Sequence, residues 1–510
     1  MDYRYILSVD LGTSFIKSAI YDTEGNCHAM TRAEVKSDNS QPGIFVQHGT
    51  EIFDSVLTCI RRVTKEFAGD RRKIGAIGFT GQMAGFMGVD SQWNDITTWS
   101  CSLDTRYLPY AESQMRHLGD QFLTISGTNS PLMAPKCEWF VNDFPEKASQ
   151  VAKYMMISSY VIGKLGQCRI EDAVLGSSYI TWTGLADIKR GEWSEELCRK
   201  SGISTEVLPK IVGGSEICGY LSNRYADVLG LPSGIPLVAG AGDKIAGCVG
   251  SGILHSGDTI FETSSYGAVS CLQQEYRPNP ERRDYDAIPA FSKDQYYLHR
   301  YLPGSGITLK WFLDTFGSGE AGDSRQQFAE IEKKIAALPC GSEGLMAVGL
   351  LGGSAMPLNG EIRGSWVGHT WSHRREHFYR ALLESYAYEL KLTLDSIHQM
   401  YPEWNRYTPI HVIGGGAGSE TWVKILADAT GSEFVRHSDS DAAMWGTAVL
   451  AGKAIGVFDS LEQVSDRIRM RQREERFFPD EKNHLLYEKY AGIYEELKRN
   501  LQDIYHQLKN

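Results

Sequence analysis

Hydrophobic and polar residues alternate in two separate stretches of the chain, and a short polar turn interrupts each of them. The first stretch covers residues 5–22, with the turn at 10–14, and the second covers 258–270, with the turn at 263–265. Alternation on both sides of a short turn predicts a β-hairpin. Because each hairpin stands near the start of one half of the chain, the pattern indicates a duplicated architecture.

Outside the hairpins, helical and strand-like patterns follow one another. Apolar positions three and four residues apart predict helices, whereas short apolar runs that end in glycine predict strands. The predicted helices cover 51–67, 146–165, 306–316, 377–400, 419–430 and 480–508, and the predicted strands cover 74–80, 235–240 and 409–413. Alternation of strands with helices predicts an α/β fold.

The sequence also indicates where the two halves meet. Small residues are concentrated over 240–252, and no low-complexity linker separates the halves. Small residues suit a hinge, so we place the boundary just after Lys244 and predict domains of residues 1–245 and 246–510.

Composition narrows the class of protein. The chain has 510 residues, of which 42% are hydrophobic and 23% charged, as in soluble globular proteins. Its formal net charge of -11 argues against a nucleic-acid partner, which would need a clustered basic surface. No apolar run reaches the roughly 18 residues of a membrane span. The ten cysteines include no C-x-x-C pair, so we expect reduced thiols in a cytoplasmic protein without a membrane partner.

The turn of the first hairpin could bind phosphate. Its glycine and hydroxyl residues, Gly12, Thr13 and Ser14, let backbone amides approach phosphate oxygens closely. Asp10, at the end of a buried strand, is placed to hold a hydrated magnesium ion, and Lys17 adds a cation. The alternative is an ordinary glycine-containing hairpin turn.

A glycine-rich segment, 414–418, lies between a predicted strand and a predicted helix. It could be a Rossmann turn, with Asp439 or Asp441 on a ribose, or a plain packing turn, or it could cradle an adenosine. The phosphate-binding pattern G-x-x-x-x-G-K-[ST] is absent from the sequence.

Asp243 is the third candidate for chemistry. It is displayed on the glycine turn 240–242 after an apolar run, where a carboxylate is suited to take a proton from a hydroxyl. The alternative is a turn aspartate that caps the next helix.

Taken in order, these segments resemble the FGGY family of carbohydrate kinases, within the actin-like ATPase superfamily. The match runs from Tyr5 to about Gly456, and the order of the matching segments is more specific evidence for the family than any single turn. Further matching segments are Gly81-Gln82-Met83, Trp99 with Asp104-Thr105-Arg106, Lys136-Cys137-Glu138-Trp139, Gly304-Ser305-Gly306 and Arg380-Ala381 with Glu384. The resemblance implies two actin-like (ribonuclease H-like) α/β domains that flank a catalytic cleft.

The resemblance also implies roles for individual residues. Asp243 would be the general base, and Asp10 would organise magnesium and the γ-phosphate. The ATP-binding set would be Thr13, Ser14, Lys17, Thr263, Ser264, Gly306, Lys310, Gly415, Gly416 and Glu420. The substrate-binding set would be Gln82, Met83, Ala84, Trp99, Asp104, Asp243 and Lys244.

Two departures from the family pattern bear on the substrate. Ala84 stands where the xylulokinase-like branch usually has His, and Lys244 follows the base where a neutral residue is more usual. Lys244 could lower the pKa of Asp243 or pair with an acidic sugar. We expect an ATP- and Mg²⁺-dependent kinase of a sugar, foremost a ketopentose such as xylulose.

The alternatives are a kinase of another ketose, a polyol or an aldonate, a non-catalytic sugar or nucleotide sensor on the same fold, and a Rossmann dehydrogenase that uses the 414–418 turn. A homodimer is a family expectation.

Overall fold

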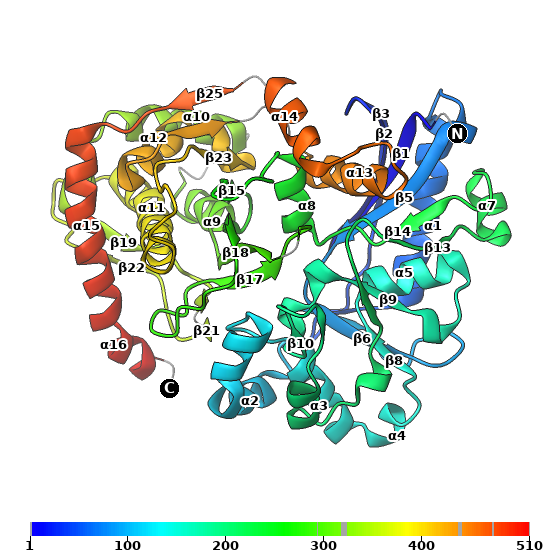
Figure 1. Ribbon diagram of the computed structural model, residues 1–510. Helices are drawn as coiled ribbons and strands as arrows, with labels where there is room; N and C mark the ends of the chain where they lie inside the picture. Colours follow the sequence, from blue (N-terminus) through cyan, green and yellow to red (C-terminus); the bar gives the residue numbers. More distant parts are fainter. Residues whose placement is uncertain are drawn as a thin grey trace.

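Two mixed β-sheets, one in each half of the chain, form the framework of the molecule (Figure 1). The structure is a computed structural model that describes residues 3–292, 294–317, 324–356, 358–436, 441–471 and 474–508. The first sheet has the order β13-β14-β5-β1-β2-β3. Its strands are β1 (Tyr5–Leu11), β2 (Phe15–Asp22), β3 (Cys27–Glu34), β5 (Ile74–Gly81), β13 (Ile217–Tyr220) and β14 (Pro236–Val238).

The second sheet has the order β17-β18-β16-β15-β23-β24-β25. Its strands are β15 (Thr259–Thr263), β16 (Gly267–Gln274), β17 (Asp286–Pro289), β18 (Gln295–Leu302), β23 (Ile410–Ile413), β24 (Phe434–Arg436) and β25 (Glu475–Phe477). In both sheets, the hairpin's first strand pairs antiparallel with its second and parallel with a later strand: β1 with β2 and β5, β15 with β16 and β23. The duplicated architecture predicted from the two hairpins is therefore confirmed.

Two helices cross between the sheets and join the halves of the chain. α8 (Asp243–Gly250) follows β14, and α13 (Ala442–Ala454), from the second half, packs on β1 and β5 of the first sheet. A Cβ atom added at Gly250 would lie 1.8 Å from the carbonyl oxygen of Ala442, and one added at Gly446 would lie 1.9 Å from that of Ala246. Only glycine fits at these two positions, because the two backbones are in contact.

The outer helices follow the predicted periodicity closely. α1 (Gly49–Glu66) packs on β2 and β3, while α9 (Gly306–Phe316), α11 (Arg375–Met400) and α12 (Glu420–Thr430) lie in the second half. The predicted C-terminal helix is divided at Leu501 into α15 (Glu481–Asn500) and α16 (Gln502–Gln507). α15 packs along α11 (Figure 1), where Lys498 reaches the buried carboxylate of Glu389 at 2.5 Å.

One predicted helix is wrong. Residues 146–165 form α4 (Pro145–Ala148), β8 (Lys153–Met155) and α5 (Ile157–Gly166) instead of a single helix. β8 pairs antiparallel with β6 (Gly85–Val89), and this pairing buries Tyr154 and Met155. The apolar residues around 151–157 were therefore consistent with either periodicity, and sheet pairing decided between them.

Shorter elements complete the fold. The first half adds β4 (Val46–Gln47), β7 (Trp99–Cys101), β9 (Val174–Gly176), β10 (Ala186–Asp187), β11 (Glu192–Trp193), β12 (Lys210–Val212), α2 (Leu108–Gln121), α3 (Met133–Asp143), α6 (Glu195–Lys200) and α7 (Asn223–Leu229). The second half adds β19 (Met346–Val348), β20 (Ser354–Ala355), β21 (Leu358–Asn359), β22 (Ser365–Val367), α10 (Ser324–Ala336) and α14 (Leu461–Arg471).

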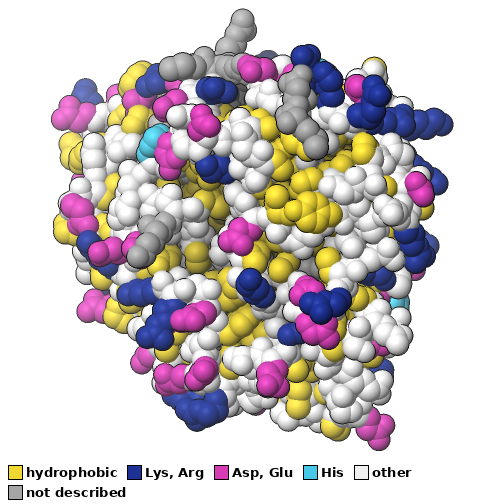
Figure 2. Space-filling view, turned by 45° about the vertical axis from the view of Figure 1, so that its right-hand side comes forward, with side chains coloured by type: hydrophobic (Ala, Val, Ile, Leu, Met, Phe, Trp, Pro, Cys, Tyr) yellow, Lys and Arg dark blue, Asp and Glu magenta, His cyan; other side chains and the backbone are white. Residues whose placement is uncertain are grey.

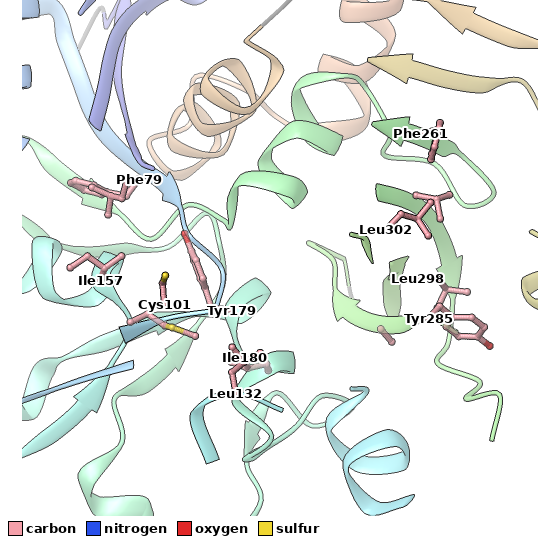
Figure 3. Packing of buried hydrophobic residues seen from close by; sticks show 14 of the residues in the cluster. Phe79, Cys101, Leu132, Ile157, Tyr179, Ile180, Phe261, Tyr285, Leu298 and Leu302 are labelled. Carbon is pink, nitrogen blue, oxygen red and sulfur yellow. The ribbon is translucent and has the colours of Figure 1, made fainter. Parts of the chain in front are cut away.

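The hydrophobic core is continuous between the two halves. One cluster of buried side chains includes Phe79 and Tyr179 of the first half together with Phe261 and Leu298 of the second (Figure 3). A buried carboxylate adds a polar contact: Asp286 of β17 accepts hydrogen bonds from the backbone N–H of Asn129 at 2.7 Å and from the Trp182 indole at 2.6 Å. The two halves are thus joined beyond the crossing of α8 and α13.

The surface carries charges of both signs. On the face drawn in Figure 2, acidic and basic side chains are interspersed. Among the described residues, no helix is both long enough and apolar enough to cross a membrane. All ten cysteines are free thiols.

Candidate active site

Alternation along β1 determines where Asp10 points. Leu7 and Val9 belong to the cluster that includes the apolar face of α1, whereas Ile6 packs with residues of α13. Successive side chains of a strand point to opposite faces, so Asp10 lies on the same face as Ile6, toward α13. Its side chain is 15% exposed at the end of the strand.

A cation on the neighbouring strand lies between two carboxylates. Lys17 is paired directly opposite Asp10 in the hairpin, and its Nζ lies 3.9 Å from Asp10 Oδ2 and 3.5 Å from Asp441 Oδ1. Asp441 is the N-cap residue of α13. The first hairpin, which holds Thr13 and Ser14 in its turn, is thereby connected to a helix from the second half.

Asp243 stands at the start of α8, on a turn that depends on close backbone approach. Gly240 has φ +67°, and a Cβ atom there would lie 1.7 Å from the carbonyl oxygen of Phe79. A Cβ atom at Gly242 would lie 2.2 Å from the Met83 side chain, so Met83 of the expected substrate set packs against this turn. Gly242, and not Asp243, is the N-cap residue of α8.

The pKa values of Asp10 and Asp243 are both raised. Burial raises the pKa of Asp10 to about 7, and the nearby Asp243 carboxylate adds to this rise. Burial also raises the pKa of Asp243, with Glu262 contributing, while the Lys244 ammonium opposes the rise. Two partly desolvated carboxylates with raised pKa values are suited to accept a proton near neutral pH or to share a cation.

The turn of the second hairpin lies against the expected nucleotide residues. Gly306, the first residue of α9, donates its N–H to the carbonyl of Ser264 at 3.0 Å. A Cβ atom at Gly306 would lie 2.7 Å from that oxygen. Thr263 Oγ1 donates to the carbonyl of Ile413 at 2.8 Å, which joins the turn to the end of β23.

The glycine segment after β23 completes this group. Gly414 has φ +94°, and a Cβ atom there would lie 2.8 Å from the Ser264 nitrogen. A Cβ atom at Gly416 would overlap the Trp422 ring at 2.1 Å, whereas one at Gly415 would meet open space. Glu420 is exposed in the first turn of α12. The ribose candidate Asp439 lies outside the described residues, and Asp441 is paired with Lys17.

A chain of amide groups connects the expected substrate set with the first hairpin turn. Trp99 Nε1 donates to Gln82 Oε1 at 3.1 Å, and Gln82 Nε2 donates to Gln47 Oε1 at 3.4 Å. Gln47 Nε2 in turn donates to the carbonyl of Thr13 at 2.8 Å. Gln47 is a buried residue that sequence reasoning missed, and no local signal marks it because it acts through contacts distant in sequence.

Some members of the expected sets are engaged by other protein groups. Asp104 has a side chain only 1% exposed, and its carboxylate accepts from Arg106 at 2.6 Å and from Ser100 at 2.9 Å. Trp99 is fully buried. Lys310 is 62% exposed and pairs with Asp314 at 2.6 Å. Contact of these residues with a ligand stays a prediction.

Lys244 is also engaged, by a residue that sequence reasoning missed. Its Nζ lies 2.7 Å from each carboxylate oxygen of Glu262, in the second hairpin. Glu262 could have been found, because it is the last but one residue of β15, as Asp10 is of β1. Ala84 is partly exposed beside Met83.

The residues present fit a magnesium ion whose coordination is completed by water and by the phosphate oxygens of a nucleotide. Mg²⁺ retains several waters and is usually held by one or two carboxylates together with phosphate oxygens. Asp10 and Asp243 offer such carboxylates next to the two hydroxyl-rich turns. Among the described residues, no group of three or more His, Cys, Asp or Glu side chains is arranged to hold a metal by itself.

Comparison with known proteins agrees with this geometry. Residues 5–250 match the N-terminal domain, and residues 261–455 the C-terminal domain, of the FGGY family of carbohydrate kinases. The chain is 25% identical to the xylulose kinase of Bacillus subtilis (strain 168), with 99% of each chain covered. It is 27% identical to the gluconokinase of the same organism, with 99% of this chain and 97% of that one covered.

Solved structures show the same fold. The crystal structure of gluconate kinase from Lactobacillus acidophilus matches with a TM-score of 0.89 at 24% identity, over 99% of each chain. The ligand-bound xylulose kinase from the same organism matches with a TM-score of 0.89 at 23% identity, again over 99% of each chain.

The fold and the site define a phosphotransferase built from two actin-like (ribonuclease H-like) α/β domains, with an alcohol group as phosphate acceptor. The fold class inferred from the resemblance is confirmed. The chain belongs to the FGGY family of carbohydrate kinases. The glycine segment 414–418 is therefore part of a kinase fold, and the dehydrogenase interpretation is excluded.

Proposed function

We propose that this kinase transfers the γ-phosphate of ATP, in the presence of Mg²⁺, to a hydroxyl of a neutral sugar, foremost a ketopentose such as xylulose. The observation that carries the proposal is the pair of partly buried carboxylates, Asp10 and Asp243, whose pKa values are both raised where the two halves meet. A non-catalytic sensor would have no need to hold two like charges near each other and partly out of water, since doing so destabilises the fold.

The roles of the residues follow from their positions. Asp243 accepts the proton of the sugar hydroxyl as that oxygen attacks the terminal phosphorus. Asp10 holds the magnesium ion, which when bound neutralises phosphate charge. Amides and hydroxyls of the turns 12–14 and 263–265 bind the phosphates, and the glycines 306, 415 and 416 line the adenosine pocket. Positioning and charge neutralisation provide most of the catalysis in phosphoryl transfer.

The engagement of Lys244 supports a neutral substrate. An aldonate carboxylate needs a free cation, and both oxygens of Glu262 already contact the Lys244 ammonium. Ala84 lacks the polar group that a histidine would place near Met83, so the other members of the substrate set must orient the ketopentose. An aldonate is the second candidate, because a gluconokinase is among the relatives. The homodimer and the cytoplasmic location stay predictions.

A substrate panel tests the proposal. ADP release is measured with ATP and Mg²⁺ against xylulose, ribulose, fructose, glycerol, xylitol and gluconate, with a no-sugar control for ATP hydrolysis. Strong turnover of one ketopentose is the expected result. Preference for gluconate would replace the neutral sugar with an aldonate. Absence of turnover, with ATP still raising the melting temperature, would favour the sensor.

A further inference from the structure

A lysine of the first half and a glutamate of the second form an ion pair beside the proposed base. Lys244 Nζ contacts both carboxylate oxygens of Glu262 at 2.7 Å, and Ser264 Oγ donates to Glu262 Oε1 at 2.5 Å. Each side chain of the ion pair is 21% exposed, so solvent screens it less than a surface pair. We call these two residues the Lys244–Glu262 bridge.

The bridge connects two parts of the proposed site that different sheets hold. Lys244 directly follows Asp243 at the start of α8, and Glu262 directly precedes Thr263 at the end of β15. The bridge therefore joins the proposed base to the turn that would bind phosphate, through Ser264.

The charges around the bridge explain why both partners are present. Glu262 raises the pKa of Asp243, and the Lys244 ammonium lowers it. Without the cation, Glu262 would be a third carboxylate beside Asp10 and Asp243. A cation without Glu262 would be free to turn toward the anionic phosphates. Together the two side chains form a nearly neutral unit with a defined geometry.

We propose that the Lys244–Glu262 bridge is a positioning element for phosphoryl transfer, which fixes the separation between Asp243 and the 263–265 turn. The inference rests on the proposed function and deepens it. Neither residue touches the reacting atoms; each acts through its neighbour, Asp243 or Ser264. Because the attacking hydroxyl must lie in line with the terminal phosphorus, a displacement of about 1 Å costs on the order of 100-fold in rate.

A double-mutant cycle tests the bridge. The variants are Lys244→Met, Glu262→Gln and the double variant, with Lys244→Arg as the conservative replacement. Each single variant should lower kcat by roughly 10- to 100-fold while the KM of the sugar changes far less. The double variant should be no slower than the slower single variant, because both changes break the same bridge. Lys244→Arg should restore most of the rate.

A matched control separates the bridge from general effects of losing an ion pair. Lys200 of α6 pairs with Glu196 at 2.8 Å on the surface, and Lys200→Met should leave kcat unchanged. Three outcomes would overturn the proposal: single variants that lower only the melting temperature, rate losses that multiply in the double variant, or a rise confined to the KM of gluconate. The last would make Lys244 a ligand of an acidic substrate.

A second measurement does not depend on turnover. In thermal unfolding, Glu262→Gln should lower the melting temperature of the wild type but hardly change that of Lys244→Met. Equal shifts in both backgrounds would mean that the two residues are not coupled, and the bridge would be rejected. Failure of the wild-type chain to phosphorylate any sugar would instead reject the proposed function. The melting temperatures would still show whether Lys244 and Glu262 are coupled.

Discussion

The two hairpins occupy equivalent places in two sheets with the same strand pairing, yet they carry different chemistry. Asp10 and Glu262 are each the last but one residue of the first strand of their hairpin. Ile6 lies on the same face of β1 as Asp10, Ile260 lies on the same face of β15 as Glu262, and the two isoleucines belong to one buried cluster. Burial, and after it the neighbouring Asp243 carboxylate, raise the pKa of Asp10 to about 7. Glu262 instead contacts an ammonium at 2.7 Å. Strand geometry thus decides where a side chain points, and its neighbours decide what it does.

The largest expected effect compares the aspartates at the starts of α8 and α13, of which we expect only Asp243 to act as a base. Asp243→Asn should lower kcat by about 10²- to 10⁴-fold, because the amide cannot accept the hydroxyl proton. ATP binding, measured by calorimetry, should be retained. Asp441→Asn, at the start of α13, is the matched control and should lower kcat less than tenfold. A near-wild-type rate for Asp243→Asn would remove it from the role of base.

The next effect separates the two equivalent carboxylates. Asp10→Ala should lower kcat by on the order of 100-fold and raise the Mg²⁺ concentration needed for half-maximal rate, because the charge facing the metal is lost. Glu262→Gln should leave the Mg²⁺ titration in place even though it slows turnover. Indistinguishable Mg²⁺ titrations for wild type and Asp10→Ala would contradict the assignment of Asp10.

A third prediction concerns a buried network that belongs to the second half alone. Burial disfavours the charged form of Glu389, but Lys498 and Arg300 outweigh it and lower the pKa of Glu389 from 4.5 to about 2. A carboxylate with a lowered folded-state pKa stabilises the fold above pH 4.5, and this stability is lost as the pH falls from about 5 to 2. The loss should be roughly 3 kcal/mol.

Melting temperatures measured between pH 7 and pH 2 check this network. The Lys498→Met variant should show a flatter acid dependence than the wild type, because the pKa of Glu389 moves back toward its ordinary value. Parallel curves for the two proteins would show that Lys498 does not control the titration of Glu389.

A fourth prediction addresses the contact between the halves. Gly446→Ala should destabilise the fold by about 1–3 kcal/mol, because the added carbon would overlap the Ala246 carbonyl. Gly247→Ala is the matched control on α8, since an added carbon there meets open space. That change should stabilise the helix by about 0.5–1 kcal/mol. Denaturant unfolding of both variants gives the comparison, and equal stabilities would argue against backbone contact.

The smallest expected effect concerns the choice of substrate, for which the first half of the chain contributes the expected sugar-binding residues. Ala84→His adds a polar group beside Met83 and should raise kcat/KM for xylulose relative to other ketoses by about 10-fold, the value of one good hydrogen bond. Ala84→Ser controls for polarity without the ring. An unchanged ranking of substrates in the panel would show that position 84 does not contact the sugar.

Local sequence patterns predict much of the fold. The helix 306–316 was predicted with its observed bounds, and the hairpins and the helix 377–400 were close to theirs, because periodicity and glycine turns are local signals. The helix 146–165 was wrong, because pairing of β8 with β6 is a long-range event. For the same reason Gln47 and Glu262 were missed, and Asp441 was assigned to a ribose and not to Lys17. Each contacts an expected site residue that is more than 15 positions away in the chain.

The crossing of α8 and α13 bears on how a chain of this kind originates. The two contacts are reciprocal, Gly250 with Ala442 and Gly446 with Ala246, as in a dimer with a two-fold axis. A single half on its own would leave its glycine-lined helix uncovered, whereas two identical halves would cover each other through the same contact. The arrangement is that of a homodimer enclosed within one polypeptide. When the two copies are joined in one chain, their sequences can diverge. Asp10 of the first half can then remain a carboxylate beside Asp243, while Glu262 at the equivalent position of the second half forms an ion pair with Lys244.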